Sequence, residues 1–186
     1  MMVNDVVNRL IIERTEKADG SIDVNVRKMP MRVEGVCKTG AYNNVGEDGM
    51  DVLNFVDADL LEPIPITPEI LLANGFEDKI EYPGWPVEDG GYHVYTKSFG
   101  LLLKMYVSKG SMMAEDNDMA PWIVCFDVKR RNFLSTVDQL QKWMRGAVMK
   151  PTSWRMAGAD EEILKLANTF SAVTEKHPVK IAPSHE

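Results

Sequence analysis

Apolar and polar residues alternate over several short stretches in the first third of the chain, which is the pattern of β-strands. In the range 8–28, an apolar Leu-Ile-Ile run is followed by turn chemistry at Ala18-Asp19-Gly20. Three apolar residues then recur at alternate positions, Ile22, Val24 and Val26. This order predicts a β-hairpin. A competing interpretation is an N-terminal helix, because four apolar residues also fit a helical stripe: Val3, Val7, Leu10 and Ile11.

Two further strands are expected close behind the hairpin, over Met31–Cys37 and Met50–Val56. The range Gly40–Gly49 between them is rich in Asn, Gly and acidic residues, so we expect a loop there. Four short strands without an intervening helix are typical of a small antiparallel sheet or a partly open barrel.

Prolines change the pattern in the next segment, where five of the ten lie between Pro63 and Pro86. Pro63 and Pro65 cannot donate to a central ladder, so they favour an extended connection. Thr67 is a good helix cap, and Pro68 fits the first helical position. A short helix is therefore expected from Pro68 until Asn74-Gly75 ends it.

The second half of the chain mixes strands with two amphipathic helices. Strands are expected over Tyr92–Tyr95 and Leu101–Val107, joined at Lys97–Gly100, and over Trp122–Val128. A helix is expected to begin at Ser135, with Asp138 in a capping-box position, and to end before Pro151. Its apolar stripe would consist of Val137, Leu140, Trp143, Met144 and Val148. A last helix from about Asp160 would bury Ile163, Leu164, Ala167 and Phe170.

This order of elements lacks regular alternation of strand and helix, so it predicts the α+β class. We expect a mostly antiparallel sheet or partly open small barrel, a short helix after the Pro-rich connector, and two C-terminal helices. Residues 1–158 would form a single α+β domain, with a β-rich part over 1–62 and a helix-hairpin-helix part over 63–158. Residues 159–186 would form a C-terminal helix and a frayed tail.

Composition narrows the class of protein. About 45% of residues are hydrophobic, and 28 acids against 21 bases give a net charge of −7. This acidic balance disfavours wholesale binding to polyanions. The N-terminus does not have the pattern of a secretory signal, and no apolar run approaches the roughly 18 residues of a membrane span. Cys37 and Cys125 are far apart in sequence and are expected to be reduced core thiols. The interpretation is a cytoplasmic protein without membrane association.

Catalytic patterns are not evident in the sequence. His93 is the one histidine expected on a strand, and a small hydrolase that pairs it with a loop acid is an alternative function. No clustered metal-ligand spacing and no Gly-rich phosphate loop is visible. We therefore expect no enzyme activity, no cofactor and no metal.

One charge asymmetry is a candidate binding feature. Residues 129–155 carry a net charge of +6, against −13 for the remainder, and Trp143 and Trp154 are interleaved with the bases. Such a pattern suits nucleic acid or an acidic partner. It also suits a helix that neutralises the protein's own acids, with Trp143 buried, and this structural role is the favoured interpretation. The candidate partner-binding residues are Lys129, Arg130, Arg131, Arg145, Trp154 and Arg155.

The segment Glu62-Pro63-Ile64-Pro65-Ile66-Thr67-Pro68-Glu69-Ile70-Leu71-Leu72, continuing to Gly75-Phe76, resembles a known signature. It is similar to the "EPIPLTxExLxxxGF" segment of small uncharacterised proteins encoded by phages, prophages and mobile elements of gut bacteria. Those proteins carry a later "VHxLQ" helix, to which Val137-Asp138-Gln139-Leu140-Gln141 corresponds. Asp138 replaces the usual His, so no role of that His carries over. The resemblance covers about residues 30–148.

The resemblance implies a setting and no established activity. It implies an accessory protein of a phage or mobile element, located in the cytoplasm of a bacterial host or associated with a virion. With no catalytic pattern, we predict a non-catalytic interaction protein that binds a host or virion protein or associates with itself. The alternatives are a nucleic-acid-binding protein that uses residues 129–155 and the small hydrolase described above.

Overall fold

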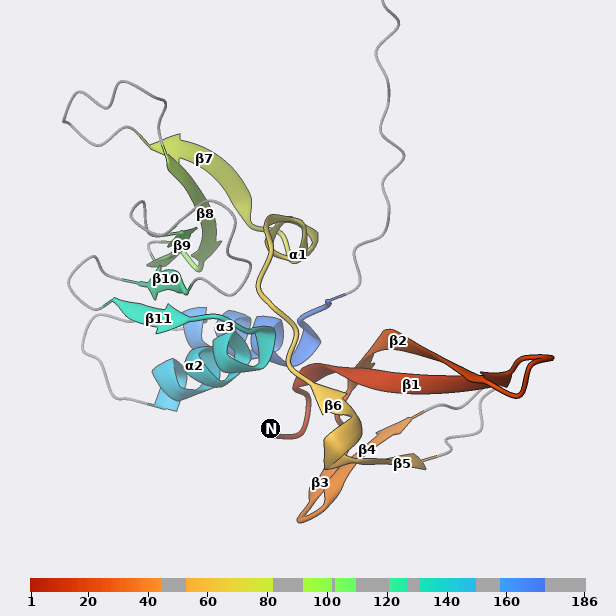
Figure 1. Ribbon diagram of the computed structural model, residues 1–186. Coiled ribbons are helices and arrows are strands. Elements are labelled where there is room, and N and C mark those ends of the chain that lie inside the picture. Colours follow the sequence, from red (N-terminus) through yellow and green to blue (C-terminus); the bar gives the residue numbers. More distant parts are fainter. Residues whose placement is uncertain are drawn as a thin grey trace, which may run out of the picture.

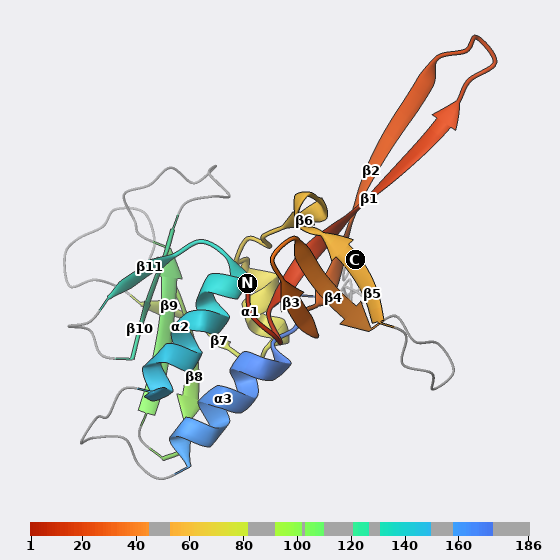
Figure 2. The ribbon, with the colours of Figure 1, turned by 90° about the horizontal axis from the view of Figure 1, so that it is seen from below.

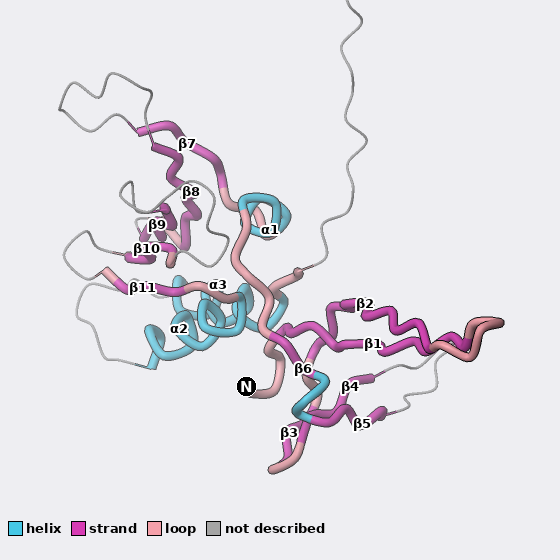
Figure 3. The backbone as a smooth tube through the Cα atoms, viewed as in Figure 1, coloured by secondary structure: helices cyan, strands magenta, loops and turns pink. Residues whose placement is uncertain are grey.

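Three antiparallel sheets and three α-helices make up the described part of the chain. The computed structural model describes residues 1–44, 53–81, 92–101, 103–109, 121–126, 131–149 and 158–172 (Figures 1 and 3). Every strand pair within these ranges is antiparallel. The predicted α+β class is therefore confirmed. The described strands form separate open sheets and do not close into a barrel.

The largest sheet has five strands in the order β11-β10-β9-β8-β7. Helices α2 and α3 lie side by side against it (Figure 2). The strands are β7 (Glu77–Glu81), β8 (Tyr92–Phe99), β9 (Leu103–Lys109), β10 (Trp122–Cys125) and β11 (Asn132–Leu134). The helices are α1 (Pro68–Ala73), α2 (Val137–Met149) and α3 (Ala159–Thr169). The two edge strands β7 and β11 escaped sequence prediction because neither carries a clear apolar alternation, and charged side chains are common on sheet edges.

The main hydrophobic core fills the space between this sheet and the helices. Leu140 and Met144 of α2 and Ile163 of α3 are fully buried there. They pack with apolar side chains from alternate positions of the central strands, including Phe99, Met105, Val107, Trp122 and Val124. Helix α3 contributes Ile163, Leu166 and Ala167 to this core.

The Pro-rich connector is extended, as its prolines predict. Ile64 and Ile66 alternate with the prolines and are buried in the main core. The backbone of Ile66 donates to Ser135, and Val137 donates to Ile64, so the connector pairs briefly with the start of α2. Helix α1 then begins at the predicted residue, and the Thr67 hydroxyl accepts a hydrogen bond from the Ile70 N–H at 3.3 Å.

Two boundaries in the second half differ from the sequence prediction. The β8–β9 turn lies at Gly100-Leu101 and not at Lys97–Gly100, and Gly100 supplies a positive φ of 57°. Helix α2 begins at Val137 and not at Ser135. The side chain of Gln139 accepts a hydrogen bond from the Ser135 N–H at 2.9 Å, and Asp138 accepts one from the Thr136 hydroxyl at 2.6 Å, so Gln139 and not Asp138 reaches back to Ser135.

The N-terminal third forms the two smaller sheets. One has the order β2-β1-β6 and the other β3-β4-β5. Their strands are β1 (Val6–Glu16), β2 (Ile22–Arg32), β3 (Gly35–Cys37), β4 (Gly40–Asn44), β5 (Leu53–Asp57) and β6 (Leu61–Glu62), with a 3₁₀ turn at Ala58–Leu60. A second, small core joins them, made of Val7, Met31, Val33, Ala41 and Val56. The predicted N-terminal hairpin is thus present, and the helical alternative is wrong.

Two expectations in this region are corrected. The strand predicted over Met31–Cys37 is interrupted between β2 and β3: Val33 still bonds to Asn4 and Asp5 just before β1, whereas the Glu34 N–H donates to Tyr42 of β4. The loop predicted over Gly40–Gly49 is a strand as far as Asn44, and residues 45–52 lie outside the described part. Gly40 is required there by close packing, since a Cβ would meet the carbonyl oxygen of Val56 at 2.1 Å.

The main core predicts a large cost for a cavity in α2. We expect Leu140→Ala to lower the free energy of unfolding by about 2–5 kcal/mol, because a fully buried side chain is lost and the site cannot collapse completely. Met149→Ala in the same helix removes a side chain that is 84% exposed and should change stability by less than about 0.5 kcal/mol. Urea unfolding followed by circular dichroism measures both. Equal effects of the two substitutions would contradict this core.

Candidate functional site

A long two-stranded arm projects from the body of the protein (Figures 1 and 2). It is the outer part of the β1–β2 hairpin, and every residue from Ile12 to Pro30 is exposed. We call residues 12–30 the arm. An isolated two-stranded hairpin is marginally stable in water. An arm of this length therefore depends on what holds its root and on what covers its faces.

The tip of the arm is a tight turn. The Lys17 N–H donates to Ser21 and the Gly20 N–H donates to Lys17, while Gly20 has a φ of +80°. The Asp19 carboxylate accepts hydrogen bonds from both the hydroxyl and the N–H of Ser21, at 2.6 and 2.9 Å. These bonds lower the pKa of Asp19 below its ordinary value, the hydroxyl contributing most. The turn chemistry predicted from the sequence thus fixes the register of the hairpin.

The two faces of the arm differ in polarity. Ile12 lies opposite Val26, and Val24 and then Ile22 follow along β2 on the same face toward the tip, opposite Arg14 and Glu16 of β1. The β-branched side chains of Ile12, Val26, Val24 and Ile22 are 46%, 51%, 54% and 64% exposed, in that order. We call them the apolar stripe. Alternation in the sequence revealed the strands, but it could not reveal that the apolar face lies in water. The other face carries Glu13, Thr15, Asp23, Asn25 and Arg27.

The root of the arm is held between the two cores. Val6 packs into the main core and Val7 into the small core, because successive side chains of a strand point to opposite faces. Strand β6 pairs with β1 at Asn8 and Arg9. Lys28 of β2 also forms a 2.6 Å ion pair with Glu62 of β6.

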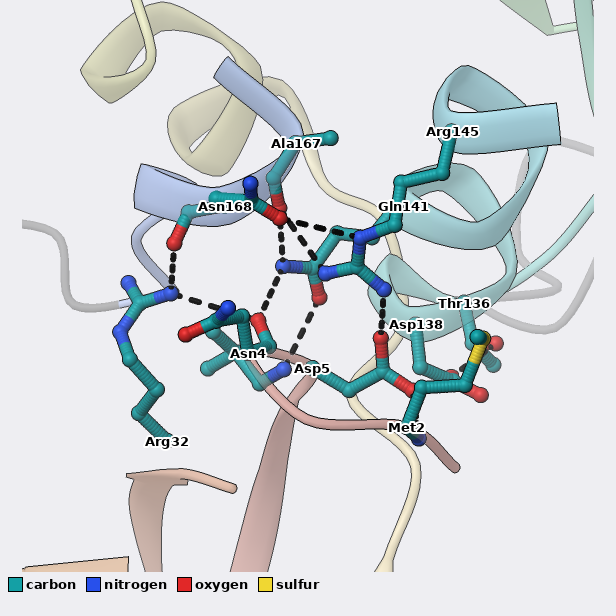
Figure 4. Close-up of polar contacts among 11 residues, drawn as sticks. Met2, Asn4, Asp5, Arg32, Thr136, Asp138, Gln141, Arg145, Ala167 and Asn168 are labelled. Carbon is teal, nitrogen blue, oxygen red and sulfur yellow. Dashed lines mark hydrogen bonds and ion pairs between the residues drawn. The ribbon is translucent and has the colours of Figure 1, made fainter. Parts of the chain in front are cut away.

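A polar network fixes the residues at the start of β1 to α2 and α3, and we call it the root network (Figure 4). Asp5 is 2% exposed, and its carboxylate lies 2.5 Å from a guanidinium nitrogen of Arg145, whose side chain is 14% exposed. Arg145 also donates to the carbonyl of Ala167 and to the Asn168 side chain in α3. One cation therefore neutralises a buried acid and joins three segments.

Gln141 completes this network from one turn earlier in α2. Its side chain is fully buried, and its amide oxygen accepts a hydrogen bond from the Val6 N–H at 2.9 Å. Its amide nitrogen donates to the carbonyls of Asn4 and Ala167, at 2.8 and 2.7 Å. A fully satisfied buried amide is a specific connector, since any shift of β1 against α2 would leave polar atoms unpaired.

The second strand of the arm is tied down in the same way. Arg32, at the end of β2, donates to the carbonyls of Asn4, Asn168 and Phe170. The carbonyls of Asn168 and Phe170 lie at the C-terminal end of α3, where a cation is favoured by the helix dipole. Both strands of the hairpin therefore start from fixed positions on the helical layer.

The basic residues singled out in the sequence are not assembled into one surface by the described part of the chain. Arg145 belongs to the root network, and Arg131 is exposed just before β11. Trp143 is partly buried, packs against the main core and stacks on Phe126 with ring centroids 4.9 Å apart. Four of the candidates lie outside the described residues: Lys129, Arg130, Trp154 and Arg155.

The residues considered for catalysis lie on the surface of the five-stranded sheet. His93 of β8 is 56% exposed, and its Nδ1 lies 2.8 Å from a carboxylate oxygen of Asp78 on β7. The acid that faces His93 is thus a neighbouring-strand residue and not a loop acid. No group of three or more His, Cys, Asp or Glu residues suited to a metal ion occurs within the described ranges.

An open hollow of about 490 Å³ lies where α1, β8 and α3 meet. Its half-buried Lys97 donates to the carbonyls of Asn74 and Gly75, and desolvation lowers the pKa of this ammonium below its ordinary value. Glu162 accepts a hydrogen bond from the Gly100 N–H at 2.8 Å. Both charged groups hold neighbouring backbone, so they serve the fold.

Comparison with known proteins adds no further constraint. The chain matches no protein-family model, and it matches no curated protein and no solved structure. Among the helices of the described ranges, none combines the length and apolarity required to cross a membrane. The arm is the candidate binding site, because its apolar stripe is exposed and its root is held by the two cores and the root network.

The root network predicts a specific instability. Arg145→Met should lower the free energy of unfolding by about 3–5 kcal/mol at neutral pH, because the buried Asp5 carboxylate loses its cation. Lys142→Met, at an exposed position of the same helix, should change it by less than about 0.5 kcal/mol. Chemical unfolding measures both values. A cost for Arg145→Met as small as that for Lys142→Met would show that Asp5 is not dependent on this pair.

The two cysteines differ in reactivity. Cys37 is exposed, contrary to the expected core position, whereas Cys125 is buried. A hydrogen bond from the Thr39 hydroxyl, 3.6 Å from Sγ, lowers the pKa of the Cys37 thiol.

We therefore expect alkylation of Cys37 to reach half its maximal rate at a lower pH than for an ordinary cysteine, because the thiolate is the reactive form. Thr39→Val should move this midpoint to higher pH. Rates followed by mass spectrometry across pH test both statements, with Cys125 as the buried internal control. A midpoint that Thr39→Val leaves unchanged would contradict the assigned cause.

Proposed function

We propose that this chain is a non-catalytic accessory protein of a phage or mobile element, which binds a host or virion protein through its arm. The observation that carries the proposal is the apolar stripe, exposed on a projecting hairpin whose root is rigidly held. Exposed hydrophobic side chains that are single and scattered need no explanation. Four β-branched side chains on one face of one ribbon form a contiguous surface, which is typical of a protein-binding site.

The energetics favour a partner. Full burial of a Val or Ile side chain contributes about 1.5–3 kcal/mol, and the stripe residues are roughly half exposed. Covering the stripe would therefore contribute about 1 kcal/mol for each residue, before the cost of association. The rigid root limits the entropy lost when the arm binds, because both strands already start from fixed positions.

The resemblance to phage and mobile-element proteins supports the setting and not the binding surface. In the structure, the resembling segment forms the connector and α1, where Ile64 and Ile66 are buried and Thr67 caps the helix. These residues serve the core. A shared core can accompany different arms, so the partner is recognised by the arm's own residues.

Affinity purification with paired variants tests this proposal. Ile12→Lys places one charge in the apolar stripe, and Thr15→Lys places the same charge on the opposite face of the same strand. Both sites are exposed, so both variants should fold. We expect Ile12→Lys to weaken recovery of the partner by about 5–30-fold, as for loss of about 1–2 kcal/mol, while Thr15→Lys recovers it normally.

The tagged protein would be expressed in a bacterial host with and without the phage or element, and recovered proteins would be quantified by mass spectrometry. Circular dichroism and unfolding curves would confirm that the two variants are equally folded. Recovery that is the same for both variants, or no specific partner from any host, would refute the assignment of the arm as the binding site.

A further inference from the structure

The outer strand of the arm has a free edge. Strand β2 is the end strand of its sheet and pairs only with β1 within the described part of the chain. In an antiparallel ladder, the backbone groups of alternate residues point toward the neighbouring strand. The Lys17 N–H donates to Ser21, so the ladder bonds with β1 continue at odd-numbered residues of β2. The even-numbered residues, Ile22, Val24, Val26 and Lys28, therefore direct their N–H and C=O groups to the free edge.

The position of the proline in β2 agrees with this alternation of backbone direction. Pro30 is even-numbered and lies opposite Asn8 near the root. Proline has no N–H and is tolerated in a strand where that position faces outward from an edge. The edge that is able to pair with another strand thus runs from Ile22 to Lys28 and ends at Pro30. Long edges of this kind are templates for pairing with another chain.

We propose that β2 pairs antiparallel with β2 of a second copy of this chain, about a two-fold axis at Asn25. This inference rests on the proposed role of the arm as an interaction surface and names the first partner as the protein itself. The pairing would join two arms into a four-stranded sheet in the order β1-β2-β2-β1. Both apolar stripes would then lie on the same face, because the residues paired across the axis have the same parity.

Charge complementarity selects this register. With Asn25 on the axis, Asp23 lies opposite Arg27 of the second copy, and by symmetry the pair occurs twice. Val24 lies opposite Val26, and Ile22 lies opposite Lys28. A register centred on Asp23 or on Arg27 would place like charges opposite each other, which is destabilising. A register centred on Val24 or Val26 would not place Asp23 opposite Arg27.

Both charged groups are available for this pairing. Within one chain, Asp23 lies 3.6 Å from Lys17, and Arg27 lies 3.8 Å from Glu13. The side chains of Asp23 and Arg27 are 67% and 63% exposed. Exposed pairs at such distances contribute little to stability, so reorienting either side chain toward a second copy costs little.

The joined sheet explains how a small acidic chain could present a large apolar surface. Each stripe alone has four residues, and the two-fold pairing would double it into one continuous face. Three or more strands with an apolar face are stable where a two-stranded hairpin is marginal. The same dimer would therefore stabilise the arms and complete the surface that covers a host or virion protein.

Charge exchange tests the register. The oligomeric state of the full chain would be measured by sedimentation equilibrium for the wild type, Asp23→Lys, Arg27→Glu and the double variant. We expect a wild-type dimer, and a dissociation constant raised about tenfold in each single variant, because the symmetry makes every change act twice. The double variant should regain the wild-type affinity, since opposite charges again face each other.

The double variant also separates contacts within one chain from contacts between copies. Within one chain, the lysine introduced at position 23 would lie beside Lys17, and the glutamate introduced at position 27 would lie beside Glu13. Both internal pairs then consist of like charges and are repulsive. Recovery of dimer affinity in the double variant must therefore come from pairing between copies. A double variant that is no better than the single variants would overturn the proposed register.

A cysteine at the axis gives a second measurement. Asn25 would be opposite its own copy at a non-hydrogen-bonded pair, where Cα atoms are about 4.5 Å apart and a disulfide is feasible. In a Cys37→Ser background, Asn25→Cys should form a covalent dimer on mild oxidation. Thr15→Cys, at an exposed position of β1, would be separated from its copy by at least three strand spacings of about 4.8 Å and should not form a covalent dimer.

Failure of this inference is distinguishable from failure of the proposed function. A wild-type protein that is monomeric at all concentrations, together with no cross-linked dimer of Asn25→Cys, would overturn the self-pairing. Selective loss of a host or virion partner in Ile12→Lys would then still hold as evidence for the arm as a binding site. A stable dimer with charge-exchange rescue supports the inference whether or not such a partner is recovered.

Discussion

The buried ion pair between Asp5 and Arg145 is the interaction on which the arrangement of this protein depends. It joins the first residues of the chain to α2, and α2 is in turn bound to α3 through the carbonyl of Ala167. Removing water from two charges is costly, and only good geometry with additional hydrogen bonds offsets that cost. The Met2 N–H donates to the Asp5 carboxylate, and Arg145 donates to the Ala167 carbonyl and the Asn168 side chain, so both charged groups have such bonds. The network thus specifies one orientation of the hairpin relative to the helices.

This constraint explains why the arm can project so far from the body. Val6 and Val7 enter different cores, so the strand is held on both faces at its root. Beyond Ile11, neither face of the hairpin is covered by the rest of the described chain. The root is therefore held on both faces, whereas the arm is held by its own ladder, its tip turn and the Lys28–Glu62 ion pair near the root. Such a division suits a binding element, because the body fixes its direction and the partner covers its apolar face.

Local signals identified the elements whose chemistry is local. The Thr67-Pro68 start of α1 depends on a cap and a first-turn proline within a few residues, and the hairpin depends on a turn at Asp19-Gly20 between two alternating runs. Close packing at single positions between distant segments could not be predicted from the sequence. Strand β4 has a loop-like composition, and Gly40 permits its close approach to the backbone carbonyl of Val56 on the neighbouring strand β5. That contact involves residues distant in sequence, so no local pattern reported it.

Short-range patterns were enough to establish the α+β class, the antiparallel hairpins, the connector and the approximate helices, because alternation, prolines and caps act over short distances. Which apolar faces are covered became visible only in the folded chain. The alternation of Ile22, Val24 and Val26 has the same form whether the face packs on a core or lies in water. Likewise, the basic segment could not reveal that Arg145 neutralises Asp5, since the two are separated by 140 residues. Burial and charge pairing depend on which distant segments meet, and that is a property of the assembled chain.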